Sequence, residues 1–345
     1  MCIRDRAKAG LLLTIADAFN YLLCGIGKVE MSMASTTQLY NPRTNVWSDR
    51  LIDALGFPRS IFPEVAAPAT TLGPLKSSLA AETTLSKLNV VSSLSHDTAC
   101  AVAACPAEGE RWAYISSGTW SLMGLEILEP IITDACRELN FTNEAGYGGS
   151  IRLLKNIIGL WLVQECRRAW AAQGNEYSYA DLAEQAGATE PYVSVLNPSD
   201  PRFLAPDDMP QRIADTWRES GQPIPGTPGA IVRCALESLS LLYARTLRES
   251  EELVGWRANT VHIVGGGSRN ELLNQLTADA ANIRVVAGPA EATASGNILV
   301  QAIAAGAVKD LAEARQIVRN SFDTKIFEPE PSEAIEEARV RFDQL

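Results

Sequence analysis

Residues 260–280, TVHIVGGGSRNELLNQLTADA, place three consecutive glycines between an apolar run and a stretch whose apolar residues have helical spacing. The apolar run predicts a strand, and the glycines predict a turn where a ligand can approach the backbone closely. A helix after the turn would bring the positive end of its dipole to Gly266. The stretch therefore predicts a strand–turn–helix unit with an anion site at Gly266; a tight turn without a ligand is the alternative.

This glycine turn departs from the dinucleotide-binding fingerprint, because Asn270 stands where a third Gly or Ala belongs. Glu291, 24 residues beyond Gly267, could still serve as the acid that binds a ribose. A dinucleotide-dependent oxidoreductase therefore remains an alternative that depends on this stretch alone. We interpret His262, on the apolar strand, as a core histidine.

Other stretches extend the alternation of strands and helices, which indicates an α/β fold with a mixed sheet. They predict a hairpin about Ser117–Gly118 (111–127), a strand passing into a long helix (150–170), a loop-rich insertion (187–229), a helix (230–253) and a second strand–turn–helix unit (283–306).

Polar residues in two of these stretches are candidate ligand contacts. The hydroxyl of Thr119 and the backbone N–H groups of its turn can form an anion-binding concavity, although an ordinary glycine hairpin explains the turn equally well. Asn156 and Gln164 are eight residues apart, and we expect them near one helical face, turned to a ligand or to solvent.

The first hundred residues are richer in turns. Leu12, Ile15, Phe19 and Leu22 have the spacing of an amphipathic helix that ends at Gly25. A short helix is predicted from Ser48 to Gly56, and an extended crossing follows it. We place a domain boundary near residue 106.

Residues 90–105, VVSSLSHDTACAVAAC, predict a buried strand followed by a helix that begins at His96–Asp97. On local pattern, Asp97 or Ser95 caps the helix. The functional alternative is that Asp97 is a general base, because a carboxylate after a strand opens onto the ligand crevice of an α/β domain. Such a group can accept a hydroxyl proton during phosphoryl transfer.

Composition limits the class of protein. With 345 residues, two domains are expected, and a net charge of −11 argues against nucleic acid or an anionic membrane as partner. The seven cysteines form no CxxC pair and there are two histidines, so we expect no zinc site and buried thiols in the reducing cytoplasm. No apolar run is long enough to span a membrane.

Five motifs, taken together and in order, resemble the rhamnulokinase family, which are sugar kinases of the FGGY group in the actin-like ATPase superfamily. They are SHDTACAVAA, WAYISSGTWSLMG, IRLLKNIIGLWLVQECRR, HIVGGGSRNELLNQLTADA and VVAGPAEATASGNILVQAIA, and the resemblance runs from about Leu11 to about Pro331. It implies transfer of the ATP γ-phosphate to the 1-hydroxyl of L-rhamnulose, with Mg²⁺ neutralising phosphate charge.

The resemblance also implies a role for individual residues. Asp97 matches the proton acceptor, and the sugar-contacting positions are those of His96, Asp97, Thr98 and Asn156. The ATP-binding positions are those of Thr119, Gln164 and Gly266.

The family opens with a strand that carries an Asp-x-Gly phosphate loop, and this sequence shows none. We therefore expect an N-terminally truncated kinase, in which residues 1–106 are the remnant of domain I, residues 107–332 form domain II and residues 333–345 are a tail. Such a chain would lack activity without that loop. The alternatives are a nucleotide-binding or oligomerising remnant, or a kinase for another ketose such as L-fuculose.

Overall fold

The computed structural model describes residues 8–205 and 207–345. At its centre lies a seven-stranded mixed sheet with the order β13-β12-β11-β7-β8-β10-β9. The neighbours β7, β11 and β12 run parallel, and the other pairs are antiparallel. This confirms the expected α/β class and mixed sheet. The strands are β7 (Trp112–Ser117), β8 (Trp120–Ile127), β9 (Thr142–Ala145), β10 (Ile151–Ile158), β11 (Thr260–Val264), β12 (Val285–Ala287) and β13 (Lys325–Phe327).

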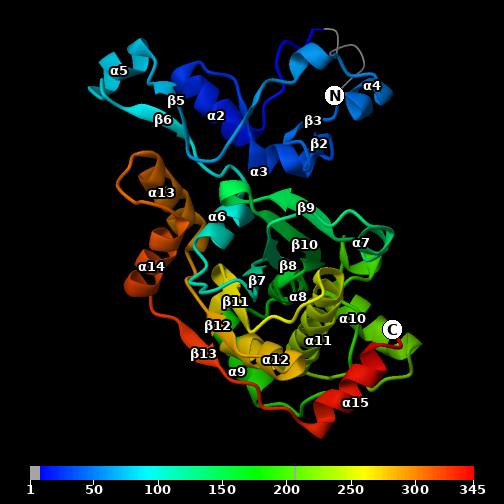
Figure 1. The fold of residues 1–345 in the computed structure, drawn as a ribbon. Helices are drawn as coiled ribbons and strands as arrows, with labels where there is room; N and C mark the ends of the chain where they lie inside the picture. Colours follow the sequence, from blue (N-terminus) through cyan, green and yellow to red (C-terminus); the bar gives the residue numbers. More distant parts are fainter. Residues whose placement is uncertain (1–7, 206) are drawn as a thin grey trace.

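Helices cover both faces of this sheet (Figure 1). Alternate residues of β7 show the division, because Ala113 and Ile115 pack in one core cluster while Trp112 and Tyr114 pack in another. The first cluster is shared with α8 (Trp161–Ala172), α11 (Pro228–Val254) and α12 (Glu271–Ala281). The second is shared with α6 (Asp97–Ala103), α13 (Ala292–Ala304) and α14 (Leu311–Ser321).

The hairpin, the two strand–turn–helix units and the helix of residues 230–253 are all present as predicted. One expectation is incomplete and another is wrong. The insertion contains α10 (Met209–Glu219), whose Met209, Ile213 and Trp217 recur at helical spacing and are buried; α9 (Tyr179–Gly187) precedes it. The expected tail is α15 (Glu333–Phe342), which buries Ile335, Ala338 and Phe342 in the main core.

Residues 8–95 form a smaller lobe above the sheet (Figure 1), with a hydrophobic core of its own around Val29 and Trp47. Its strands make two-stranded pairs only, namely β1 (Val29–Glu30) with β4 (Val65–Ala66), β2 (Tyr40–Asn41) with β3 (Val46–Trp47), and β5 (Thr70–Pro74) with β6 (Asn89–Ser92). Its helices are α2 (Ile15–Cys24), α3 (Met31–Ala34), α4 (Asp49–Ala54) and α5 (Ser77–Thr83).

Helix α2 confirms the predicted amphipathic helix, and Gly25 ends it in the left-handed conformation with φ 80°. Its apolar side chains do not pack in a core, since Ile15 is 75% exposed and Phe19 is 61% exposed. The buried residue of this helix is instead Asp17. Within the described residues, no helix has the length and apolarity that crossing a membrane requires.

Candidate active site

Asp97 is the first residue of α6, directly after the turn that follows β6. The N-cap is His96, whose Nδ1 accepts the Thr98 N–H at 3.2 Å, so the expectation that Asp97 or Ser95 caps the helix is wrong. The Asp97 side chain is 78% exposed, and its Oδ1 accepts the Thr98 N–H at 2.6 Å. The expected sheet context also differs, because β6 pairs with β5 and lies outside the seven-stranded sheet. Asp97 therefore presents its carboxylate to solvent beside a helix N-terminus.

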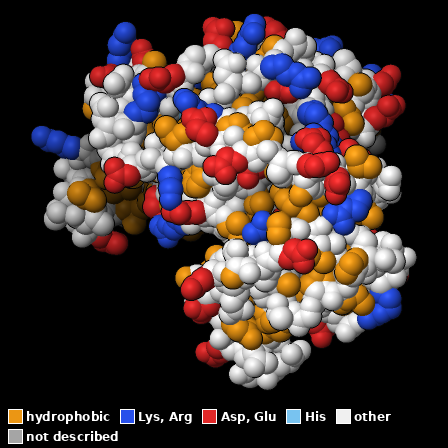
Figure 2. Space-filling model, turned by 90° about the horizontal axis from the view of Figure 1, so that it is seen from below, with side chains coloured by type: hydrophobic (Ala, Val, Ile, Leu, Met, Phe, Trp, Pro, Cys, Tyr) orange, Lys and Arg blue, Asp and Glu red, His pale blue; other side chains and the backbone are white. Residues whose placement is uncertain are grey.

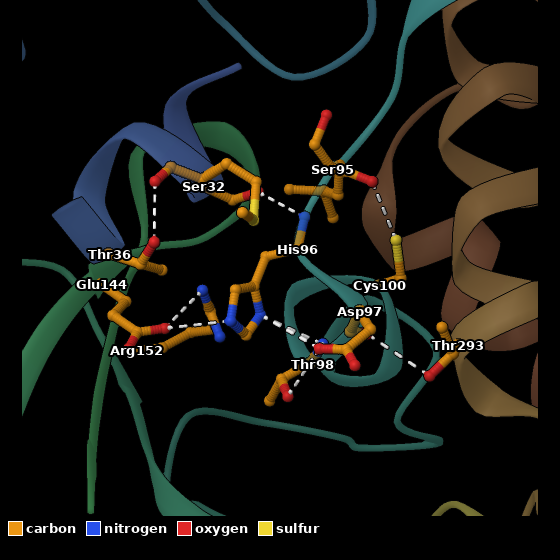
Figure 3. A network of polar contacts seen from close by, with 12 residues as sticks. Ser32, Thr36, Ser95, His96, Asp97, Thr98, Cys100, Glu144, Arg152 and Thr293 are labelled. Atoms are coloured by element: carbon orange, nitrogen blue, oxygen red, sulfur yellow. Dashed lines mark hydrogen bonds and ion pairs between the residues drawn. The ribbon is translucent and has the colours of Figure 1, made fainter. Parts of the chain in front are cut away.

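The imidazole of His96 lies between Glu144 of the sheet and Asp97 of α6 (Figure 3). Its Nε2 is 3.9 Å from Glu144 Oε2, and the same oxygen is 3.0 Å from Nη2 of the fully buried Arg152. Burial lowers the pKa of His96, and the nearby Arg152 charge lowers it further. A neutral ring whose Nδ1 accepts a hydrogen bond carries its proton on Nε2, which faces Glu144. Thr98 is buried, and its hydroxyl donates to Asp97 Oδ1 at 3.3 Å.

Helix α13 supports α6 from behind. A Cβ on Gly296 would lie 1.9 Å from the Cys100 carbonyl oxygen, so the two backbones can approach this closely only at a glycine. The small residues Ala99, Ala101 and Ala103 of α6 are buried. On the first turn of α13, Thr293 Oγ1 donates to the Asp97 carbonyl oxygen at 3.4 Å (Figure 3).

A cavity of about 570 Å³ lies beside the hairpin turn and the glycine turn. It brings together Thr119, Gln164 and Gly266, which the sequence placed at nucleotide-binding positions. Its other lining residues are Gly118, Leu160, Val163, Tyr179, Ala180, Leu182, Ala183, Val232, Gly267, Arg269 and Asn270.

The cavity owes its shape to close backbone contacts. The hairpin turn accepts two N–H bonds at Thr119 O, from Gly159 and Trp161, each at 3.1 Å. Gly265 has φ 85°, and a Cβ on Gly267 would lie 2.0 Å from Ser117 Oγ, so both positions need glycine. A Cβ on Gly266 would meet nothing within 4 Å, so its backbone faces open space.

Asn156 and Gln164 do not share a helical face, and that expectation is wrong. Asn156 belongs to strand β10 and pairs with Leu122, whereas Gln164 belongs to α8. Asn156 is exposed. It is four residues from Arg152 on the same strand, so both side chains lie on the same face of the sheet, the face that α6 covers. The apolar run before Gly159 is compatible with strand or helix, and periodicity alone cannot separate the two.

Residue contacts connect the cavity to Asp97. Arg269, which lines the cavity, forms an ion pair of 3.5 Å with Glu291, the residue before α13. Thr293, two residues later, bonds to Asp97. The first turn of α13 therefore lies between the cavity and the exposed carboxylate.

Comparisons with solved structures define the fold. The chain superposes on a xylulose kinase from Lactobacillus acidophilus with a TM-score of 0.72 at 16% identity, covering 97% of this chain and 66% of that one. Glycerol kinase from Plasmodium falciparum, solved with ADP, gives a TM-score of 0.75 at 15% identity over 99% of this chain and 66% of that one. The fold is thus that of the actin-like ATPases.

Sequence comparisons define the family. Residues 4–104 match the N-terminal domain and residues 113–305 the C-terminal domain of the FGGY family of carbohydrate kinases, and this chain belongs to that family. It is 43% identical to a rhamnulokinase of Bacteroides thetaiotaomicron over 97% of this chain and 68% of the relative. Its identity to a rhamnulokinase of Bacillus subtilis is 44%, over 93% of this chain and 66% of that relative. The dinucleotide-dependent oxidoreductase is therefore excluded. The chain spans about two thirds of the length of these relatives.

Proposed function

We propose that this protein binds ATP in the 570 Å³ cavity and a ketose beside Asp97, and that it transfers the γ-phosphate to the 1-hydroxyl of L-rhamnulose. The observation that carries the proposal is the arrangement at α13, whose first turn separates the nucleotide cavity from Asp97 by a few residues. A triphosphate that extends from the cavity along this turn would bring its terminal phosphate toward the carboxylate. The names of the curated relatives supply the ketose.

We assign each residue a role that its position supports. The open backbone at Gly266, the hydroxyl of Thr119 and the amide of Gln164 bind the nucleotide. The exposed Asp97 carboxylate accepts the proton of the attacking hydroxyl as the phosphoryl group transfers. His96 and Asn156 contact the sugar from the turn and from the sheet. Thr98, the other expected sugar contact, is buried, and we assign it the orientation of the Asp97 carboxylate through its N–H.

Mg²⁺ is the divalent ion we propose for this reaction, and it would neutralise phosphate charge. The described residues contain no group of three or more His, Cys, Asp or Glu side chains that could hold a metal. A magnesium ion commonly binds through substrate phosphates and one or two carboxylates. We therefore assign no residue of this chain as its ligand, and the roles above do not depend on one.

A nucleotide-binding or oligomerising remnant without turnover is the second candidate, and the exposed apolar side chains of α2 favour its oligomerising form because such surfaces commonly mediate association. Calorimetry with ADP and an assay of ADP release with L-rhamnulose or L-fuculose separate the candidates. Gly266→Val should abolish ADP binding by filling the cavity, whereas Gly187→Val, which also meets open space but lies outside the cavity lining, should not. Nucleotide binding without ADP release would favour the second candidate. Faster ADP release with L-fuculose than with L-rhamnulose would show that L-fuculose is the preferred substrate.

A further inference from the structure

Two carboxylates are buried next to each other in the small lobe, close to the turn that carries Asp97. Asp17 on α2 is 1% exposed and Glu30 at the end of β1 is 0% exposed. Asp17 Oδ1 accepts the Glu30 N–H at 3.2 Å. Burial raises the pKa of both groups, and among the described residues no Lys or Arg forms an ion pair with either. Burying an acid without a cation is unfavourable, so the hydrogen bonds that these two carboxylates make need an explanation.

Both carboxylates bind Ser95, which lies two residues before Asp97. Glu30 Oε2 accepts the Ser95 N–H at 2.9 Å, and Asp17 Oδ1 accepts the Ser95 hydroxyl at 3.4 Å. These contacts join positions 65 and 78 residues apart in the sequence. The residue that begins the turn is therefore fixed through its backbone and through its side chain.

The next residue is held by the same group. His96 N–H donates to Ser32 Oγ at 3.0 Å (Figure 3), and the Ser32 hydroxyl donates in turn to Glu30 Oε2. Glu30 Oε2 also accepts the Ser32 N–H at 3.0 Å. Oε2 of Glu30 thus accepts from three donors, while Oε1 of the same side chain has no hydrogen-bond partner among the described residues. We call Asp17, Glu30 and Ser32 the carboxylate clamp.

The chain segment that contains Ser32 also contacts the seven-stranded sheet. Ser35 Oγ accepts the N–H of Ala145 on β9 at 2.9 Å, and Ala145 follows Glu144, which faces His96. The turn therefore has the clamp on its backbone side and Glu144 with Arg152 on its imidazole side. A displacement of the clamp would move Asp97 relative to the sheet that carries the nucleotide cavity.

We propose that Glu30, assisted by Asp17 and Ser32, is a positioning residue that holds the backbone of Ser95 and His96 so that Asp97 faces the transferring phosphate. This inference rests on the proposed kinase function for its catalytic consequence only, since the clamp itself is a matter of geometry. Phosphoryl transfer depends on alignment, so a looser turn should lower kcat more than it weakens nucleotide binding.

The test uses the full chain and compares Glu30→Ala with Glu30→Gln and with a control, Glu64→Gln, whose carboxylate in the same lobe is 72% exposed and paired with Lys28. Amide hydrogen exchange of Ser95 and His96 is the first measurement, ADP affinity the second, and kcat and KM for L-rhamnulose the third. In Glu30→Ala, the two amides should exchange about tenfold faster or more, with ADP affinity unchanged and kcat reduced. Glu30→Gln retains an accepting oxygen and should restore most of the protection, and the control should match the parent.

Parental exchange at Ser95 and His96 in Glu30→Ala would overturn the proposal, as would an equal acceleration of every amide in residues 8–95. If Glu30→Ala does not fold, Ser32→Ala decides, because it removes the acceptor of the His96 N–H and should accelerate that amide. A parent chain that binds ADP but shows no turnover contradicts the proposed function and leaves the exchange result to decide on the clamp.

Discussion

The sequence alone could not decide whether Asp97 is a helix cap or a general base. The pattern correctly places it at the start of a helix, but His96 is the cap, and the Asp97 carboxylate is left mostly in solvent. The carboxylate also accepts the Thr98 N–H of the first turn at 2.6 Å, so it stabilises the start of the helix while remaining open to solvent. A general base needs an accessible carboxylate, which Asp97 has, and the bond from Thr293 to the Asp97 backbone carbonyl oxygen places that residue beside the first turn of α13.

We expect Asp97→Asn to lower kcat by roughly 10²–10⁴-fold, with little change in KM for L-rhamnulose, because the variant loses the proton acceptor and keeps the shape. The fold should persist, since the N-cap bond belongs to His96 and Asn can still accept the Thr98 N–H. Steady-state kinetics with a matched melting curve checks this. Near-parental kcat would show that Asp97 is not the base.

His262 confirms the interpretation as a core histidine, since it is 5% exposed and stacks edge-on to Trp112. Burial, and then the charges of Arg315 and Arg319, lower the pKa of His262 to about 4. The unfolded value is near 6.5, so the unfolded state binds a proton first. Stability is therefore fully present above pH 6.5 and is lost as the pH falls toward 4.

We expect this histidine to cost roughly 3 kcal/mol of stability between pH 6.5 and pH 4. In His262→Gln, which does not titrate, the free energy of unfolding should fall less over that interval than in the parent. Urea denaturation at several pH values measures the difference. Equal pH dependence in the two chains would show that His262 is protonated in the native state without penalty.

At the scale of elements, the units defined by local signals were predictable. The glycine turn before α12 and the hairpin at Gly118 follow from residues within a few positions of each other. Asn156 shows the limit, because an apolar run that ends in a glycine is compatible with either element until its neighbours are known. Helix α10 was missed because prolines and glycines around it concealed three apolar residues at helical spacing.

The crossing of α6 and α13 gives an element-scale prediction. Gly296→Ala would place its Cβ 1.9 Å from the Cys100 carbonyl oxygen, so the helices must separate and α6 must shift. We expect a loss of about 1–3 kcal/mol in the free energy of unfolding, together with reduced kcat because α6 carries Asp97. Ile298→Ala, at an exposed position of α13, is the control and should change both by little. Urea denaturation measures this, and an unfolding midpoint in Gly296→Ala equal to that of the parent would contradict the close crossing of the two helices.

At the scale of the molecule, the contacts that hold the active-site turn could not be predicted. Glu30 and Ser95, or Glu144 and His96, are distant in the sequence and share no periodicity, so only the folded arrangement brings them together. The net negative charge, in contrast, could be predicted from the composition alone. Figure 2 shows Asp and Glu interspersed with Lys and Arg over the face seen from below, in keeping with the net charge of −11 and with small-molecule substrates.

The exposed apolar side chains of α2 give the prediction at this scale. Ile15, Phe19 and Leu22 are 75%, 61% and 59% exposed on one short helix, and soluble proteins rarely leave such a group uncovered. We expect the chain to self-associate as its concentration rises. Ile15→Gln with Phe19→Gln should reduce the mass seen by light scattering, with a change in unfolding free energy of about 0.5 kcal/mol or less because neither side chain is buried.

Ile298→Gln is the matched control for this experiment, since Ile298 is an isolated side chain on α13 that is 65% exposed. It should leave the concentration dependence of the parent unchanged, because a single exposed apolar residue is ordinary on a protein surface. A parent chain that stays monomeric at every concentration would contradict the prediction. Equal effects of the α2 and α13 variants would assign association to general surface hydrophobicity and not to α2.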